Sequence, residues 1–281
     1  MVKIITDTTA ALPSEDAQRY GICVIPQIIH FGTDSYQEGI ELDNATFMQK
    51  LRTCRELPKT AAPSPEMFVE EFRRWVPSGQ PILCIHPSAE ASGTVRSATT
   101  AALEFPDADI RVVDTRSVGS PLGSMVLMAA EWARAGDGVG SVESRLRGLI
   151  PRVRIYFLVA TLAYLARGGR IGGATALLGS VLQVKPILTL RDGRVETQEQ
   201  ERTQKRAVAR LRELVVEQCP RDVSAHLTVM HAASPDQAQA LATDLARVLG
   251  TPEVPIVDMP PAIATHGGPG MLGVGFFASA Q

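Results

Sequence analysis

"PILCIHPSAEASGTVRSATTAALEFPDADIRVVDT", residues 81–115, contains a continuous apolar strand, a polar loop, a helix and a second apolar strand. The loop ends in Ser-Gly-Thr, and we expect the helix to start at Ser92. Residues 2–7 predict another buried strand, and residues 22–32 predict a β-rich run in which Pro26 indicates a bulge or an edge. Strands that alternate with helices are typical of a parallel sheet with helices on both faces. We therefore expect an α/β fold whose first domain has three layers, α/β/α.

The composition argues against several classes of protein. The chain has 281 residues, of which 45% are hydrophobic and 21% are charged, as is ordinary for a globular protein. A formal net charge of -2 argues against a nucleic-acid-binding surface, which would be basic. The longest apolar stretch runs from Tyr156 to Ala166, well short of the ~20 residues that a membrane span needs. We expect a cytoplasmic protein with no nucleic acid partner and no stable membrane insertion.

The second half of the chain has a different pattern, which starts at about Val153. Its β-rich segments include residues 185–196, where an Asp-Gly pair predicts a tight hairpin and therefore antiparallel strands. We predict a first domain over residues 1–150 and a second α/β domain over residues 151–281, with a mixed, partly antiparallel sheet. A cleft between two domains is the default place for a ligand. The two long helices expected in the second domain cover residues 202–218 and 235–249.

Three loops of the first domain are candidate binding loops, because ligands of such sheets lie beyond the carboxyl ends of the strands. They are the Thr6–Thr9 loop, the loop that ends in Ser92 and Gly93, and the segment KTAAPSP, in which we expect Thr60 to lie in a rigid turn. The N–H groups at a helix start bind anions. Ser92 can instead serve only as the cap of its helix, and both interpretations stay open.

"THGGPGMLG", residues 265–273, places His266 beside a glycine-rich segment. Its glycines satisfy G-x-G-x-x-G, the spacing associated with dinucleotide binding. A dinucleotide site also needs a helix that opens on the last glycine and an acidic residue about 20 positions later. In the 281-residue sequence only eight residues follow Gly273, so we expect no nucleotide here. What remains is a flexible turn next to an imidazole, which can meet a small anionic group.

Two further segments contain arginines that can face an anion. In "LARGGRIGG", Arg167 and Arg170 flank two glycines after an apolar run, which is also typical of a helix that ends in a left-handed glycine with solvated arginines. In "ERTQKRA", Arg202 and Thr203 open a basic helix, and such a face is commonly solvated. Neither segment decides between these alternatives.

Nucleophilic catalysis and metal binding have little support. No G-x-S-x-G elbow is present. A pair formed by Ser92 and His266 stays open, although no acidic residue that would orient the histidine is identifiable. The five histidines show no H-x-x-x-H spacing, so we expect neither a metal site nor a cofactor.

Seven segments, taken together and in this order, resemble the DegV family over nearly the whole chain. The segments are TDTTAALP, PKTAAPSPEMF, SGTVRSATTAA, VVDTRSVGSPLG, LARGGRIGGATALLGSVLQVKPIL, DGRV with ERTQKRA, and HGGPGMLGVGF. Members of that family are similar to the fatty-acid-binding subunit of bacterial fatty acid kinase. The resemblance implies two α/β domains with one fatty acid held between them, its acyl chain in a buried tunnel and its carboxyl group near the surface.

The resemblance also implies roles for individual residues. The residues that match the carboxylate ligands of the family are Thr60, Ser92 with the Gly93 backbone, and His266. Arg202 matches an arginine implicated near the head group and in the contact with a kinase. Arg170, in the RGGRI motif, is a candidate for a conformational or head-group role.

The chain departs from the family pattern at two places. Ala61-Ala62 stands where the family usually has Ser-Gln, and His86-Pro87 stands where serine-rich turns are usual. These changes leave the carboxylate-binding hydroxyls in place and can alter the shapes of the two loops. The contact with a kinase is therefore affected more than the binding of lipid.

The functional expectation follows from this resemblance. We expect a protein, not itself an enzyme, that binds a long-chain fatty acid as its ligand and presents the carboxyl group to a separate ATP-dependent fatty acid kinase. Two alternatives stay open. One is a lipid or acyl-ester hydrolase that uses Ser92 and His266, and the other is a lipid-sensing module without a kinase partner.

Overall fold

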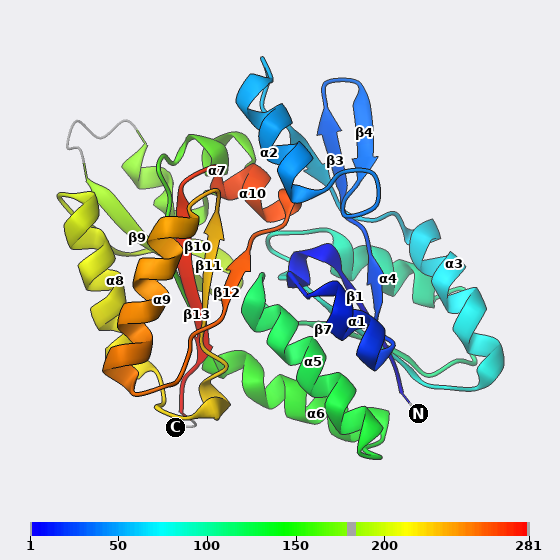
Figure 1. Ribbon diagram of the computed structural model, residues 1–281. Coiled ribbons are helices and arrows are strands. Elements are labelled where there is room, and N and C mark those ends of the chain that lie inside the picture. The colour runs from blue at the N-terminus through cyan, green and yellow to red at the C-terminus, as the bar shows by residue number, and fades with distance from the viewer. Residues whose placement is uncertain (1, 179–183, 280–281) are drawn as a thin grey trace. The chain divides into compact units, whose positions relative to one another are not determined.

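The computed structural model describes residues 2–178 and 184–279 (Figure 1). The chain divides into two compact units, Met1–Pro151 and Arg152–Gln281, and each has its own sheet and hydrophobic core. Residues 179–183, which belong to the LARGGRIGGATALLGSVLQVKPIL segment, lie outside the described residues. The expected α/β fold, with one parallel and one mixed sheet, is confirmed.

The central sheet of the first unit is parallel throughout. Its strands, in spatial order, are β2 (Cys23–Ile25), β1 (Lys3–Asp7), β6 (Ile82–His86) and β7 (Ile110–Asp114). Every residue of β1 and β6 is buried, because helices cover both faces of the sheet. Burial on both faces explains why these strands are continuous apolar runs in the sequence. The carboxyl ends of β1 and β6 lie side by side, so the loops that follow them are neighbours.

Helices cover both faces of this sheet (Figure 1). On one face, Phe68 and Phe72 of α3 and Ala98 of α4 are fully buried against the strands. Burial of each phenylalanine contributes ~1.5–3 kcal/mol. On the other face α5 and α6 contact β6, and α1 packs on α5. The helices are α1 (Ser14–Tyr20), α2 (Asn44–Thr53), α3 (Pro65–Trp75), α4 (Thr94–Ala102), α5 (Ser120–Arg134) and α6 (Val139–Leu149), and the short 3-10 turns are η1 (Thr8–Ala10), η2 (Val76–Ser78) and η3 (Ile150–Arg152).

A separate antiparallel sheet corrects two expectations. Its strands, in spatial order, are β4 (Asp34–Gln37), β3 (Ile28–Phe31) and β5 (Lys59–Ala61). The β-rich run over residues 22–32 is divided at Pro26 between the two sheets, since proline has no N–H to donate to a strand ladder. Thr60 lies in β5, paired with Ile29, and not in the rigid turn that the sequence predicts. A strand of three residues is too short to show a periodic pattern of its own.

The second unit has a mixed sheet of six strands. Their spatial order is β10 (Arg194–Glu201), β9 (Lys185–Arg191), β8 (Val153–Leu158), β13 (Met271–Phe277), β11 (Thr228–Ala232) and β12 (Ile256–Asp258). Only β11 and β12 run parallel, and the other neighbours are antiparallel. The predicted hairpin is confirmed, since Asp192 and Gly193 join β9 to β10 with positive φ angles of 50° and 82°.

Two long helices pack on this sheet, as the sequence predicts. Ala207, Leu211 and Leu214 recur at helical spacing on one face of α8 and are buried in the core of the unit. The helices of this unit are α7 (Ala163–Arg167), α8 (Gln204–Gln218), α9 (Pro235–Leu249) and α10 (Pro261–Gly267), with 3-10 turns η4 (Gly172–Leu177) and η5 (Val223–Ala225). No helix among residues 2–178 and 184–279 has both the length and the apolar character needed to cross a bilayer.

Candidate functional site

Ser92 lies in the loop between β6 and α4, and the backbone holds it in place. The carbonyl group of Ser88 accepts hydrogen bonds from the N–H groups of Ala91 and Ser92, at 3.0 and 2.9 Å. The helix begins at Thr94, with Gly93 at the cap position, so the predicted start at Ser92 is two residues too early. Ser92 is therefore not the N-cap residue of α4. Its Oγ accepts a hydrogen bond from the Thr94 N–H at 3.3 Å, and the residue is half-buried.

Gly93 brings the end of β5 close to the start of α4. A Cβ atom at Gly93 would lie 3.4 Å from the Cβ of Ala62, so the segment that follows Thr60 packs on the Ser92–Gly93 loop. In the described part of the chain, no protein acceptor contacts the Gly93 N–H. An N–H group at a helix start that has no intrahelical partner is suited to an anion. The segment that follows Thr60 therefore lies beside the Ser92–Gly93 loop, and the role of these residues as carboxylate ligands stays a prediction.

His266 lies in the last turn of α10, a helix that the sequence analysis did not predict. The flexible turn expected there begins at Gly268 (φ 74°) and continues through Gly270 (φ 87°). The helix packs on α7. A Cβ atom at Gly168 would lie 2.1 Å from Nδ1 of His266, and one at Gly268 would lie 2.4 Å from the ring of Tyr164. The glycines of the two motifs are therefore needed because α7 and α10 approach so closely.

Arg170 follows a helix end of the kind that the sequence suggests. Gly169 has φ 70°, and the Arg170 N–H donates to the carbonyl group of Leu165 at 2.9 Å, which closes the end of α7. Arg167 is exposed, as expected of a solvated arginine. Arg170, in contrast, is half-buried, and its Nη1 donates to the carbonyl group of Gly168 at 2.6 Å. Arg170 therefore lies close to His266, which packs on the same glycine.

The imidazole of His266 is neutral at pH 7. Burial lowers the pKa of His266 from its usual 6.5 to about 4, and the positive charge of Arg170 contributes to the lowering. Removal of a cation from water is unfavourable, and a neighbouring guanidinium adds repulsion. A neutral imidazole carries one N–H donor. That donor can bind a carboxylate while Arg170 supplies positive charge nearby.

This pKa predicts a loss of stability in acid. Below pH 6.5 His266 becomes protonated in the unfolded chain, whereas in the folded protein it becomes protonated only at about pH 4. The stabilisation is fully present above pH 6.5 and is lost as the pH falls toward 4, by ~3 kcal/mol in total and ~2 kcal/mol at pH 5. Urea unfolding at pH 7.5 and pH 5 should show this extra loss in the wild type relative to His266→Gln. Equal losses in the two proteins would contradict the lowered pKa.

A buried pair, Asp7 and His86, lies at the carboxyl ends of β1 and β6. Both side chains are fully buried, and Nδ1 of His86 lies 2.8 Å from Oδ2 of Asp7. Oδ1 of Asp7 accepts hydrogen bonds from the Thr9 N–H at 2.9 Å and from Nε2 of Gln27 at 3.0 Å. The sequence analysis missed this pair, because the two residues are 79 positions apart. Asp7 is thus an acidic residue that orients a histidine, but that histidine is His86.

Comparison with known proteins identifies the family. A family model described as "Uncharacterised protein, DegV family" matches residues 1–279 of the chain. This chain belongs to the DegV family. A DegV domain-containing protein of Streptomyces coelicolor is 42% identical over 282 residues, with 97% of each chain covered.

Solved DegV structures have the same fold. A DegV family protein from Thermus thermophilus, described by its fatty acid binding, matches with a TM-score of 0.89 and 33% identity over 99% of each chain. DegV of Bacillus subtilis, described as a fatty acid binding protein, matches with a TM-score of 0.89 and 31% identity, again over 99% of each chain. The recognition of the family from its seven segments is therefore confirmed.

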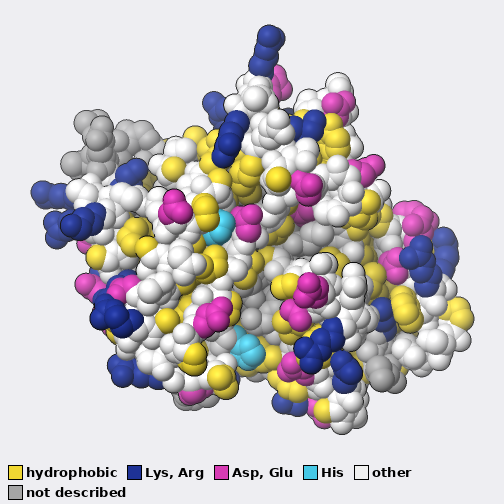
Figure 2. All heavy atoms as spheres, in the orientation of Figure 1, with side chains coloured by type: hydrophobic (Ala, Val, Ile, Leu, Met, Phe, Trp, Pro, Cys, Tyr) yellow, Lys and Arg dark blue, Asp and Glu magenta, His cyan; other side chains and the backbone are white. Residues whose placement is uncertain are grey.

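Arg202 occupies a different environment from Arg170 in this DegV protein. It is exposed and directly precedes Thr203, which caps α8 by accepting a hydrogen bond from the Arg206 N–H at 3.3 Å. Lys and Arg side chains gather over α8 in the space-filling view (Figure 2). The predicted basic helix is confirmed, whereas a head-group role for Arg202 stays a prediction.

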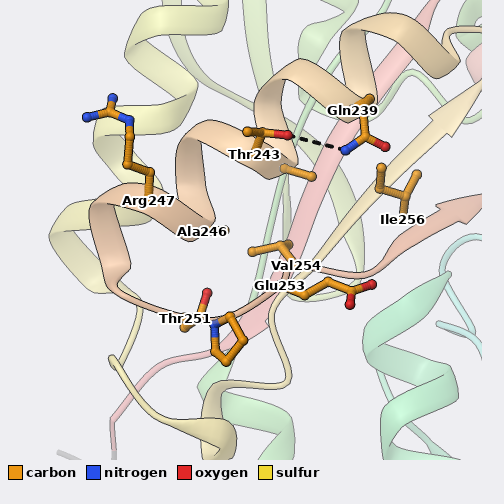
Figure 3. A pocket seen from close by; sticks show the side chains of 10 residues that line it. Gln239, Thr243, Ala246, Arg247, Thr251, Glu253, Val254 and Ile256 are labelled. Atoms are coloured by element: carbon orange, nitrogen blue, oxygen red, sulfur yellow. Dashed lines mark hydrogen bonds between the residues drawn. The ribbon is translucent and has the colours of Figure 1, made fainter.

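A pocket of the second unit is lined by other residues. It has a volume of about 660 Å³ and is lined by α9, residues 251–254 and Ile256; a hydrogen bond joins two of its lining residues, Gln239 and Thr243 (Figure 3). Glu253 lines it and would repel a carboxylate. It contains none of the four predicted carboxylate ligands, and neither Arg170 nor Arg202 lines it. In the described ranges, no three His, Cys, Asp or Glu side chains are grouped so as to hold a metal ion.

Proposed function

We propose that this DegV protein binds one long-chain fatty acid and presents its carboxyl group to a separate ATP-dependent kinase. The carboxylate ligands are Thr60, Ser92 and the Gly93 N–H of the first unit and His266 of the second. The observation that carries the proposal is the likeness, over 99% of the chain, to two DegV proteins described as binding fatty acids, at 33% and 31% identity.

The chemistry of the candidate ligands supports this proposal. Two hydroxyl groups, a backbone N–H and a neutral imidazole all can donate hydrogen bonds, and a carboxylate only accepts them. Hydrogen bonds to an ionised acceptor are about twice as strong as neutral ones. The head group alone would bind weakly in water, so the acyl tail dominates affinity, at ~0.8 kcal/mol for each buried methylene group.

The hydrolase alternative has less support. A serine nucleophile needs a base that accepts its proton. In the first unit, the partners of Ser92 Oγ among the described residues are the N–H and the hydroxyl group of Thr94, and neither is a base. The acid Asp7 contacts His86 and not Ser92. No observation favours turnover at this serine.

Mass spectrometry tests the binding of lipid directly. An organic extract of the purified protein should contain a fatty acid, and the mass of the intact protein under native conditions should correspond to one fatty acid per chain. The protein should not hydrolyse added acyl esters. Absence of lipid, with no binding of added fatty acids, would overturn the proposal. Hydrolysis of acyl esters that is lost in Ser92→Ala would replace it with the hydrolase.

The kinase role has its own test. With a bacterial fatty acid kinase and ATP, the loaded protein should support acyl-phosphate formation. Arg202→Ala should lower the rate of this reaction more than it lowers affinity for the fatty acid, because Arg202 is exposed next to the basic face of α8. A matched variant at another exposed arginine, Arg167→Ala, should change the rate less. Tight lipid binding without acyl-phosphate formation would instead favour a lipid sensor.

A further inference from the structure

A chain of buried hydrogen bonds runs from the Asp7–His86 pair to Ser92. Nε2 of Gln27 lies 3.0 Å from Oδ1 of Asp7 and 3.0 Å from Oγ1 of Thr94. Oγ1 of Thr94 lies 2.8 Å from Oγ of Ser92. Asp7 and Thr94 are fully buried and Gln27 is 3% exposed, whereas Ser92 is half-buried. The chain therefore connects the interior of the first unit to a hydroxyl group that a ligand can reach.

The direction of each hydrogen bond follows from the first acceptor. A carboxylate has only acceptors, so Asp7 requires the amide nitrogen of Gln27 to face it. The same nitrogen donates its second proton to Oγ1 of Thr94. The hydroxyl proton of Thr94 then needs an acceptor, because an unsatisfied buried donor is costly. Among the described residues, Oγ of Ser92 is the acceptor within reach of it.

This direction decides what Ser92 offers to a ligand. Its Oγ accepts from the hydroxyl group of Thr94 and from the Thr94 N–H at 3.3 Å, so both lone pairs are occupied. The hydroxyl proton of Ser92 is left to point away from the network. A group that can only donate a hydrogen bond binds an ionised carboxylate more strongly than it binds a neutral head group.

The ends of the network are fixed. Nδ1 of His86 donates to Oδ2 of Asp7 at 2.8 Å, and the edge of the His86 ring meets Phe68 with centroids 5.2 Å apart. The backbone N–H of Gln27 donates to the hydroxyl group of Thr8 at 3.1 Å, and that hydroxyl group donates to the buried Glu38. Neither Asp7 nor Gln27 can turn without breaking several buried bonds.

We propose that Asp7 and Gln27, acting through Thr94, are positioning residues that make Ser92 an obligatory hydrogen-bond donor and so give the site its preference for an ionised carboxylate. This inference rests on the proposed binding of fatty acid at Ser92. It adds a specificity-determining network within the first unit that touches the ligand only through the serine.

The test compares two ligands of equal chain length, a fatty acid anion and the corresponding fatty alcohol. In Thr94→Val the donor to Ser92 is lost, and the ratio of the two dissociation constants should move toward the alcohol by about tenfold. Thr94→Ser keeps the hydroxyl group and should keep the wild-type ratio. Gln27→Met, which removes the donor to Thr94 with little change in volume, should shift the ratio in the same direction. A structural defect would weaken both ligands equally and leave the ratio unchanged.

A double-mutant cycle separates this role from others. In the Ser92→Ala background, Thr94→Val and Gln27→Met should no longer change the ratio, because they act through the serine. An unchanged ratio in both single variants, or the same shift with and without Ser92, overturns the inference. In either case the proposed function stands as long as the wild type binds the fatty acid. If the wild type binds neither ligand, the proposed function fails and the inference with it.

Discussion

The triple variant Thr60→Ala/Ser92→Ala/His266→Ala is expected to bind a long-chain fatty acid at least about 100-fold more weakly than the wild type. Each substitution removes a hydrogen bond to a charged group, worth ~1.5–3 kcal/mol, and 1.4 kcal/mol corresponds to a factor of ten. The three losses are not strictly additive because the groups share one ligand. Displacement of a fluorescent fatty acid measures the affinity, and thermal unfolding monitors the fold.

The control for this variant removes a hydroxyl group from α4, the helix that follows the Ser92 loop. Thr100 is exposed on α4, and Thr100→Ala should bind the fatty acid as the wild type does. The affinity of the triple variant for the fatty alcohol should fall less than its affinity for the acid, because hydrogen bonds to a neutral hydroxyl group are weaker than those to an ionised carboxylate. Binding of the acid within about threefold of the wild type, less than the loss of one hydrogen bond, would show that these residues do not hold the carboxylate.

Gly168→Ala is expected to reproduce the binding defect of His266→Ala, about tenfold, without any change to the histidine itself. The new Cβ would lie 2.1 Å from Nδ1 and 2.7 Å from Cε1 of His266, so the imidazole must turn away. Because Cβ would also lie 3.1 Å from the backbone oxygen of Tyr164, the protein should lose ~1–3 kcal/mol of stability. Affinity measurements and urea unfolding test the two parts of the prediction.

Gly169→Ala is the matched control for that substitution. Its Cβ meets nothing within 4 Å, but the residue has φ 70°, where alanine costs ~1–2 kcal/mol. The control should therefore lose stability and keep its affinity for fatty acid. The double variant Gly168→Ala/His266→Ala should bind no more weakly than His266→Ala. A further loss in the double variant would mean that Gly168 acts on the ligand by a route other than His266.

The main elements of the fold were predictable from local patterns. Apolar runs that alternate with helical segments predict the parallel sheet, and the Asp192–Gly193 pair predicts the β9–β10 hairpin; the structure confirms both. The three-stranded sheet was not predicted, because β5 has only three residues and pairs with Ile29, far away in the sequence. The helix α10 was also missed, because its seven residues lie among prolines and glycines that indicate turns.

The candidate site was predictable only in part. The resemblance to the DegV family selected Thr60, Ser92, Gly93 and His266, and the structure packs the segment after Thr60 on the Ser92–Gly93 loop. No local pattern connects Asp7 with His86 or Gln27 with Thr94, which are 79 and 67 positions apart. A hydrogen bond depends on positions in space, and sequence patterns extend over only one helix or strand.

The sequence by itself determined the family, the α/β class and the identity of the residues that can donate to a carboxylate. The class follows from the periodicity of apolar residues, whereas the family and the candidate carboxylate ligands follow from the resemblance of seven segments to other DegV proteins. The tertiary structure alone decided how those groups are tuned. Burial near Arg170 makes His266 neutral, a missing Cβ at Gly168 leaves room for its ring, and Asp7 directs the hydroxyl proton of Ser92. Desolvation, close packing and the direction of a hydrogen bond depend on neighbours that only folding brings together.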